Sequence, residues 1–434
     1  MKSILHNYLL ISVLAIALIP NSGCRKDSNP VVIIEPLTIG VILPLDQEKG
    51  VLRENAMRTA VNIINASGGV GEGRMIELVV RSSEGVNREE TAVAAAREII
   101  KSKSNLVGFI SSFSSCSKGL VEQVAIPDGY PVISGAATAG FLSGISPYFQ
   151  RLCPPDAYEA IVLTNKAKEY GFDNIAIAVE EGDVYSSDLA NAFQNEFGNG
   201  ASVKVLFSSA DPDYSVKLDQ LLSGNPDAVF LSMLNPVVYE EFLAKMNELN
   251  ENDRFSNISF ILSDAFYTTS VFNSPIAMMV GELNGHPKNF GAITAADTNT
   301  SPYKYFEAEL NKQFDQEVAS YNAQFFDIIY IYALAIEKTL IDTGTDDMKA
   351  FREKLQYWIR QVSNGADFDP AVMPSLGWKS LKEACKNGGV DYVGASGNCD
   401  LDGFGNAITP YAVFNIAGDQ GSYYFETISM VFPE

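Results

Sequence analysis

Two short runs of small, hydroxyl-bearing residues are the features of this sequence best suited to bind an anion. The strand expected at 106–110 is followed by the serine-rich run 111–117, from whose last residue, Ser117, a helix is expected to run. Free backbone N–H groups and the positive end of the helix dipole attract a carboxylate at such a position, and serine hydroxyls add directed hydrogen bonds. The alternative is that Ser115 or Ser117 only caps the helix.

A second run, 134–138, follows the next expected strand, 131–133. Parallel strands end at one edge of a sheet, where open α/β sheets bind ligands, so both runs are expected beside one crevice. The alternative is a turn of small residues with Thr138 in solvent. Further along, Asp264 follows the expected strand 259–262. Its carboxylate could pair with a ligand ammonium and complete a clamp for a zwitterion, or it could form only a turn or a cap.

The remaining residue types disfavour several other kinds of chemistry. The chain has two histidines, His6 and His286, which excludes His-rich metal sites and disfavours histidine-dependent catalytic triads. The segment 400–406 is similar to a calcium loop, but Phe404 stands where an EF-hand needs an oxygen ligand, so we expect a hairpin turn. We therefore expect a protein that is not an enzyme, with no catalytic residues, no metal and no cofactor.

Composition and net charge indicate a globular protein and disfavour one class of partner, nucleic acids. The 434 residues predict two or three domains, and 47% apolar with 19% charged residues is ordinary for a globular protein. Lys and Arg total 31 against 53 Asp and Glu, a formal charge of −22. A chain this acidic repels phosphates, so no nucleic-acid partner is expected.

The N-terminus predicts export. Residues 1–24 have a basic start at Lys2, an apolar stretch over 8–20 that is too short to span a bilayer, and a Ser-Gly-Cys end. That end resembles a bacterial lipoprotein box, which implies a lipid on Cys24, a tether over 25–36 and attachment to a membrane on its periplasmic or other extracytoplasmic face. The alternative is ordinary signal cleavage with Cys24 uninvolved.

Four cysteines remain after Cys24, an even number in an oxidising compartment, so disulfides are expected. Four thiols allow three pairings. Proximity in the sequence favours Cys385 with Cys399, which leaves Cys116 with Cys153.

Alternating strand and helix patterns predict an α/β fold with two doubly wound, Rossmann-like lobes. The expected strands are 38–43, 75–81, 106–110, 131–133, 148–152, 174–179, 202–206, 227–231 and 259–262, and the expected helices are 53–66, 88–101, 117–125, 157–170, 187–197 and 237–249. The segment 321–340 is apolar nearly all round but is interrupted by polar residues, so we expect a buried helix rather than a membrane span.

Several stretches in this order resemble the type I periplasmic solute-binding proteins, in particular the branched-chain amino-acid-binding family of ABC importers. They are residues 39–45 (IGVILPL), 64–70 (INASGGV), 133–138 (ISGAAT), 151–157 (RLCPPDA) and 226–230 (PDAVF). The resemblance implies hinge strands between lobe 1 (37–152 plus 290–406) and lobe 2 (153–289 plus 407–434). It implies a monomer that closes on an amino acid or related carboxylate and delivers it to an ABC permease.

The resemblance also implies the ligand-binding residues. Ser114 and Ser115 match the family's ligand-binding serine position, and Ala136, Ala137 and Thr138 lie in the segment that binds the carboxylate and ammonium. From the second lobe, Tyr185 matches a tyrosine that lines the cleft, and Asp264 stands where the family often keeps an acid for the ammonium. Lys49 is expected in solvent rather than over the ligand.

This sequence departs from the family pattern at three places near the implied cleft. Ser186 replaces a glycine, 233–235 (MLN) stands where many relatives have a cleft tyrosine, and the loop 46–51 (DQEKGV) is more charged than the small-residue loop usual in the family. The pocket for the ligand's side chain is therefore not predicted. Two other functions remain open: a ligand-sensing receptor component of the same fold, and an extracytoplasmic hydrolase.

Overall fold

The computed structural model describes residues 35–85, 87–249, 258–273, 288–343, 347–363, 377–387, 389–418 and 422–432. The predicted signal sequence, Cys24, nearly all of the predicted tether and His286 lie outside the described residues.

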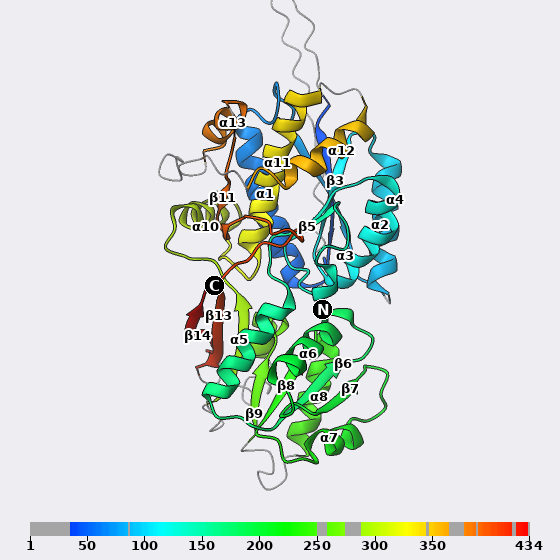
Figure 1. The fold of residues 1–434 in the computed structure, drawn as a ribbon, viewed down its shortest axis with the longest axis vertical. Coiled ribbons are helices and arrows are strands. Elements are labelled where there is room, and N and C mark those ends of the chain that lie inside the picture. The colour runs from blue at the N-terminus through cyan, green and yellow to red at the C-terminus, as the bar shows by residue number, and fades with distance from the viewer. Residues whose placement is uncertain are drawn as a thin grey trace, which may run out of the picture. The chain divides into compact units, whose positions relative to one another are not determined.

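The first sheet has five parallel strands in the order β2-β1-β3-β4-β5. Figure 1 labels two of them, β3 and β5. These are β1 (Leu37–Leu43), β2 (Ile76–Ser82), β3 (Leu106–Ser111), β4 (Val132–Ser134) and β5 (Phe149–Arg151). Because β3 and β4 are parallel neighbours, the two segments that follow them leave the same edge of the sheet.

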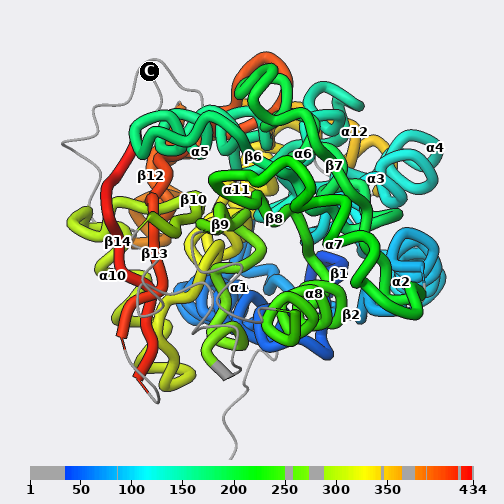
Figure 2. The backbone as a smooth tube through the Cα atoms, turned by 90° about the horizontal axis from the view of Figure 1, so that it is seen from below, coloured from blue at the N-terminus to red at the C-terminus, as the bar shows by residue number. Residues whose placement is uncertain are grey.

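The second sheet has seven strands in the order β14-β13-β10-β9-β8-β6-β7. They are β6 (Ile175–Glu180), β7 (Val203–Phe207), β8 (Ala228–Ser232), β9 (Ser259–Leu262), β10 (Phe290–Thr294), β13 (Tyr411–Ala417) and β14 (Tyr424–Val431). The strands from β7 to β10 are parallel, whereas β13 and β14 are antiparallel and lie side by side at one edge (Figure 2). A two-residue pair, β11 (Val393–Gly394) and β12 (Gly397–Asn398), forms a separate ribbon.

Helices cover both faces of each sheet. They are α1 (Glu48–Ala66), α2 (Arg88–Ser102), α3 (Ser114–Leu120), α4 (Ile126–Asp128), α5 (Asp156–Glu169), α6 (Val184–Phe197), α7 (Ser215–Leu222), α8 (Pro236–Glu248), α10 (Ser301–Phe314), α11 (Asn322–Thr343), α12 (Met348–Ile359) and α13 (Trp378–Asn387), with a π-helical turn η1 (Val121–Ala125) after α3 and short 3₁₀ turns η2 (Gly140–Leu142), η4 (Asp264–Phe266) and η5 (Thr269–Asn273). This arrangement confirms the predicted α/β class with two doubly wound sheets.

The side chains of β1 pack into the apolar cores on both faces of the first sheet. Ile39, Val41 and Leu43 pack with α1 and α11, whereas Ile42 packs with α2 on the opposite face. Successive side chains of a strand point to opposite faces, so a strand covered on both sides is apolar without interruption. In the second sheet, α7 and α8 cover one face, and α5 and α6 cover the other.

The long helix α11 confirms the interpretation of the apolar segment 321–340. Its residues from Asn322 to Thr339 are buried, and it packs against α1, α12 and α13. Asp327 on this helix accepts hydrogen bonds from the Tyr392 hydroxyl, the Ala395 N–H and both the N–H and the hydroxyl of Ser396. The helix is thereby fixed to the β11–β12 ribbon.

The chain passes from the first sheet to the second after β5 and returns after β10. The lobe boundary predicted at residue 290 differs from this arrangement, because β10 pairs with β9 on one side and with β13 on the other. Residues 290–294 therefore belong to the second sheet. The helical segment that begins with α10 packs with α1 and α11 beside the first sheet.

The predicted disulfides are wrong. Cys116, Cys153, Cys385 and Cys399 are buried free thiols. Cys116 Sγ lies 3.7 Å from the Arg88 carbonyl, Cys385 Sγ lies 3.6 Å from the Leu334 carbonyl, and Cys399 Sγ lies against Asp327 and Ser396. Each of these three sulfurs is thus packed against other groups instead of a second sulfur, and burial raises the pKa of all four thiols.

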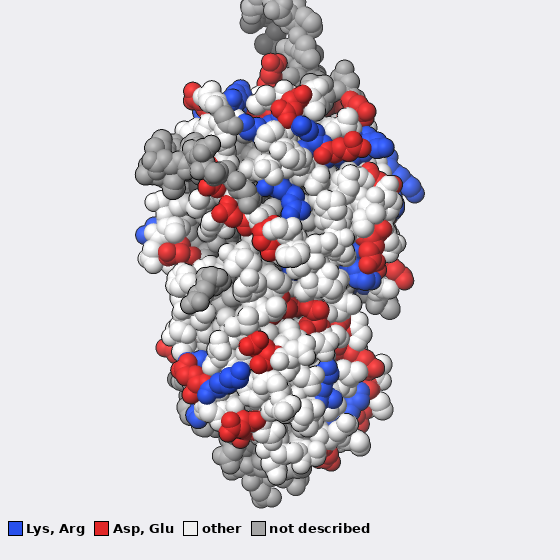
Figure 3. Space-filling model, in the orientation of Figure 1, with Lys and Arg blue, Asp and Glu red and all other residues white. Residues whose placement is uncertain are grey.

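The visible surface in Figure 3 carries acidic and basic side chains mixed together, without a continuous basic patch. This agrees with the acidic composition. Among the described residues, none of the helices is both long and apolar enough to cross a membrane.

Candidate functional site

The segments after β3 and β4 are joined by serine hydroxyls. Ser134 Oγ donates to the carbonyl of Ser111 at 3.1 Å and accepts from the N–H of Ala137 at 3.1 Å. Ser114 Oγ accepts from the N–H of Ala139 at 3.2 Å. These bonds hold the start of α3 and the run 134–138 together at one edge of the sheet, as the sequence predicts.

Helix α3 begins at Ser114, earlier than the predicted start at Ser117. Phe113 occupies the N-cap position and makes no side-chain capping bond. Ser117 instead shares a 2.7 Å hydrogen bond with the Ser111 hydroxyl inside the protein. The interpretation of Ser115 or Ser117 as the helix cap is therefore wrong, and the α3 N-terminus has no side-chain cap.

Residues from the second sheet meet this edge. Tyr185 lies in the first turn of α6, where Asp183 caps the helix by accepting from the Ser186 N–H at 2.8 Å. Asp264 follows β9 in the turn η4, and its N–H donates to Glu159 Oε1 at 2.9 Å. The Asp264 carboxylate accepts hydrogen bonds from the hydroxyls of Tyr185 and Tyr321.

A cavity of about 520 Å³ lies where these segments meet. Of the residues predicted to bind a ligand, it is lined by Ser114, Ala136, Thr138, Tyr185 and Asp264. Ser115 and Ala137 are not among the described residues that line it. A small organic molecule of amino-acid size fits this volume.

Lys49 and Arg53 on α1 and Tyr321 immediately before α11 also line the cavity. Neither Arg53 nor Tyr321 was singled out from the sequence, and Lys49 was placed in solvent. Lys49, expected in solvent, is half-buried, with its ammonium 5.1 Å from the centre of the Phe113 ring. Tyr321 adopts a left-handed backbone conformation, with φ at 64°, which is rare for a bulky residue and directs its hydroxyl to Asp264.

Burial shifts the pKa values of three charged residues that line the cavity. Burial, together with the positive charges of Arg53 and Arg88, lowers the pKa of Lys49 to about 7. Burial lowers the pKa of Arg53 to about 10. On the acidic side, burial raises the pKa of Asp264, and the hydrogen bonds from Tyr185 and Tyr321 oppose that rise.

Two more buried carboxylates stand near Asp264. Glu159 and Asp156, both on α5, are fully buried. Burial and the negative charge of Asp264 raise the pKa of each well above its usual range. Neither residue is among the described residues that line the cavity.

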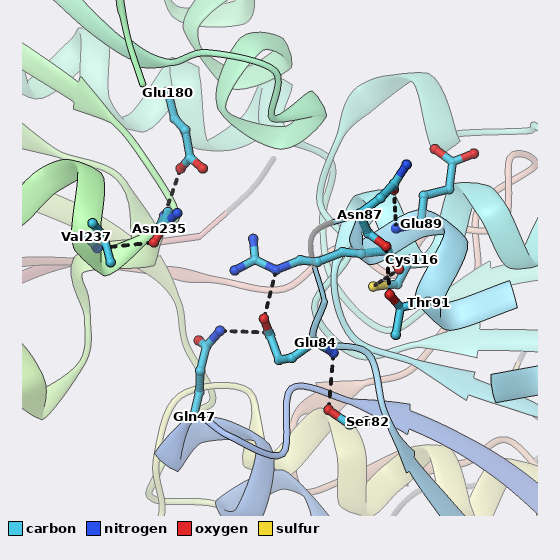
Figure 4. A network of polar contacts seen from close by, with 11 residues as sticks. Gln47, Ser82, Glu84, Asn87, Glu89, Thr91, Cys116, Glu180, Asn235 and Val237 are labelled. Atoms are coloured by element: carbon cyan, nitrogen blue, oxygen red, sulfur yellow. Dashed lines mark hydrogen bonds and ion pairs between the residues drawn. The ribbon is translucent and has the colours of Figure 1, made fainter. Parts of the chain in front are cut away.

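Figure 4 shows the polar contacts of the neighbouring loops. Gln47, at the N-cap of α1, donates from its amide to Glu84 at 2.8 Å, and Arg88 donates to the other oxygen of Glu84 at 3.3 Å. Across the view, Glu180 accepts from the N–H of Asn235, and it also accepts from the N–H of Leu234. The segment 233–235, where relatives have a tyrosine, is thus held by Glu180, and Leu234 lines the cavity.

The segment 400–406 forms a turn around Asp402. Asp402 Oδ1 accepts from the N–H groups of Phe404 and Asn406, at 2.8 and 2.9 Å. The predicted turn is confirmed. Within the described ranges, no group of three or more His, Cys, Asp or Glu side chains is arranged to hold a metal ion.

Comparisons with known proteins agree with this geometry. A family model described as "Receptor family ligand binding region" matches residues 52–419. A comparison with curated protein sequences finds no match.

Solved structures share the fold at low sequence identity. The leucine-binding protein LivK of Thermotoga maritima is 21% identical, with a TM-score of 0.68 over 92% of this chain and 99% of that one. LivJ of Streptococcus pneumoniae, a branched-chain amino acid transporter substrate-binding protein in complex with isoleucine, is 15% identical, with a TM-score of 0.67 over 90% and 99%. A Rhodopseudomonas palustris solute-binding protein in complex with 4-hydroxybenzoate is 16% identical, with a TM-score of 0.69 over 92% and 97%. The predicted resemblance to type I periplasmic solute-binding proteins is confirmed at the level of the fold.

Proposed function

The chain belongs to the family described as receptor family ligand binding region, and we propose that it is an extracytoplasmic solute-binding protein. It captures a small amino-acid-like or carboxylate ligand between two lobes and delivers it to an ABC importer. A lipid on Cys24 holds the protein at the membrane, within reach of the permease. The protein catalyses no reaction on its ligand.

One observation carries this proposal: residues from both sheets converge on a single cavity. Ser114 and Thr138 come from the carboxyl edge of the first sheet, whereas Tyr185 and Asp264 follow strands of the second. Ligands of open α/β sheets bind at this edge. A ligand in the cavity therefore contacts both lobes and favours their closed arrangement.

The α3 N-terminus is the proposed carboxylate site. Its backbone N–H groups and the Ser114 hydroxyl stand beside the run 134–138, which adds backbone donors and the Thr138 hydroxyl. Solved neighbours of this fold are complexes with isoleucine and with 4-hydroxybenzoate. Both ligands are carboxylates of a size that a cavity of about 520 Å³ admits.

Isothermal titration calorimetry with a panel of amino acids and benzoates tests the proposal. At least one compound is expected to bind with micromolar affinity, and Ser114→Ala is expected to weaken it by more than ~1 kcal/mol, the low end for a hydrogen bond to a charged group. Ser117→Ala is the matched control on the same helix, because Ser117 bonds to Ser111 and not to the cavity. Equal affinities for both variants would reject the proposed carboxylate site.

A further inference from the structure

Arg53 is a buried cation that forms no direct ion pair with the described residues. Its side chain is 4% exposed and lines the cavity from α1. Nη1 donates to the Ser112 hydroxyl at 2.5 Å, and the guanidinium lies 5.4 Å from the ring centres of both Tyr321 and Phe325. Its Nε–H is buried and has no hydrogen-bond partner among the described residues.

Another buried arginine shows what a structural role looks like in this protein. Arg151 is fully buried, and its guanidinium donates to the Asn406 side chain, to the carbonyls of Ala137 and Ala139, and to the Ser143 hydroxyl. All three nitrogens of Arg151 are therefore used by the protein. Arg53 makes one such bond with the described residues, so further donors of its guanidinium are left for another molecule.

No carboxylate of the described chain lies within 4.0 Å of Arg53 or of Lys49, the other cation of the cavity wall. The carboxylates that line the cavity besides Asp264 are Glu48, Asp315 and Glu317, which are exposed at its rim. An unpaired buried charge is strongly unfavourable, whereas an exposed carboxylate is screened by water. The inner wall on the α1 side is therefore positive.

Asp264 does not neutralise this wall by direct contact. Its two oxygens accept from the Tyr185 and Tyr321 hydroxyls, and the Tyr321 ring, from which one of those hydroxyls comes, stacks near the Arg53 guanidinium. The Asp264 carboxylate thus already accepts two hydrogen bonds from the protein, whereas Arg53 and Lys49 form no ion pair with a carboxylate of the described residues. A ligand ammonium finds fewer free partners here than a ligand anion does.

We propose that the ligand carries a net negative charge and that one of its carboxylates forms a paired hydrogen bond with the Arg53 guanidinium. This inference rests on the proposed function and names its ligand class: carboxylates with more negative than positive charge, rather than zwitterionic amino acids. The planar fork of an arginine matches the two oxygens of a carboxylate, and the buried position strengthens the pair.

The experiment is calorimetry on the full processed protein with L-leucine, L-isoleucine, L-glutamate, glutarate, benzoate and 4-hydroxybenzoate. At least one of the four net-anionic probes is expected to bind at least tenfold more tightly than either zwitterion. Arg53→Gln is expected to weaken that probe at least tenfold, and Arg53→Lys to weaken it less. Arg58→Gln, at a partly exposed residue of the same helix that pairs with Glu54 and does not line the cavity, is the control and is expected to change affinity less than twofold.

Thermal unfolding without added ligand separates a ligand contact from a structural role. Because Arg53→Gln removes an uncompensated buried charge, the midpoint is expected to stay level or rise, whereas loss of a structural arginine lowers it. Tighter binding of a zwitterion, an anion affinity insensitive to Arg53→Gln, or a lowered midpoint would overturn the inference while leaving a solute-binding function in place. Absence of binding by all six probes would overturn the proposed function and the inference with it.

Discussion

Lys49 is expected to make ligand affinity depend on pH between 7 and 9. Burial and the positive charges of Arg53 and Arg88 lower its pKa to about 7 in the empty cavity. A bound carboxylate stabilises the protonated ammonium, so the pKa of Lys49 rises in the complex. By linkage, binding then takes up a proton, and affinity falls as the pH rises above the pKa of the free protein.

The size of the effect follows from the protonated fraction of Lys49. With a pKa of about 7, roughly half of the free protein carries the proton at pH 7 and about one molecule in a hundred at pH 9. If the protonated form is the one that binds, affinity falls about 50-fold over this range, which is about 2.3 kcal/mol at 1.36 kcal/mol per factor of ten. Proton uptake at pH 7 is about 0.5 per ligand bound, and it approaches about one at pH 9.

Calorimetry in buffers of different ionisation enthalpy measures this uptake directly. The other charged groups that face Lys49 are Arg53, Arg88, Asp264 and Glu84. Arg53, with a pKa lowered to about 10, stays charged through most of the range. Lys49→Met is therefore expected to flatten the pH dependence, and Lys101→Met, an exposed position on α2, is expected to keep it. Equal slopes for the wild type and Lys49→Met, or a wild-type affinity constant from pH 7 to 9, would refute the reasoning.

Two further predictions concern the scaffold and the N-terminus. Asp327→Ala removes a buried carboxylate that accepts hydrogen bonds from Tyr392, Ala395 and Ser396. Urea unfolding is therefore expected to show a free energy of unfolding lower by ~3 kcal/mol or more. The exposed Asp342→Ala on the same helix is expected to lower it by less than ~1 kcal/mol, and equal losses would contradict this role of Asp327. The wild-type protein is expected in the detergent phase of a Triton X-114 extraction of whole cells and Cys24→Ser in the aqueous phase, and finding both in the aqueous phase would exclude the lipid anchor.

Much of the site could be predicted because it depends on topology. Strands alternate with helices in a pattern that is local in the sequence, and the pattern places the ends of parallel neighbours at one edge. Ser114 and Thr138 therefore lie together in the structure, and Asp264 follows its own strand toward the same cavity. The exact start of α3 was missed, since Phe113 takes the N-cap without a side-chain bond.

The disulfides could not be predicted from spacing. A disulfide needs two Cβ atoms about 3.8 Å apart with a suitable torsion, and closeness in the sequence supplies neither. Cys385 lies on α13, which packs on α11, whereas Cys399 follows the β11–β12 ribbon and contacts Asp327. Both sulfurs fill positions in the core, where cysteine behaves as a small apolar residue.

The cations of the cavity escaped prediction for a different reason, although one signal was present. Arg53 precedes Ala56, Met57 and Ala60 at helical spacing, so it stands on the apolar stripe of α1. A charged residue on a buried stripe requires a partner, and none is visible in the local sequence. The groups that contact Arg53, Ser112 and Tyr321, come from distant parts of the chain and are brought to α1 only by the fold.

The site thus has two kinds of binding group, backbone N–H groups placed by the topology and side chains placed by individual residues. The backbone N–H groups at the start of α3 come with any strand followed by a helix, so they specify a carboxylate without specifying which one. Arg53, Lys49 and Tyr321 are side chains placed by α1 and by the residue before α11, outside the strand ends that every protein of this fold shares. Ligand specificity can therefore differ between proteins of this fold while the sheet edge stays the same. It depends on the buried charged side chains rather than on the topology.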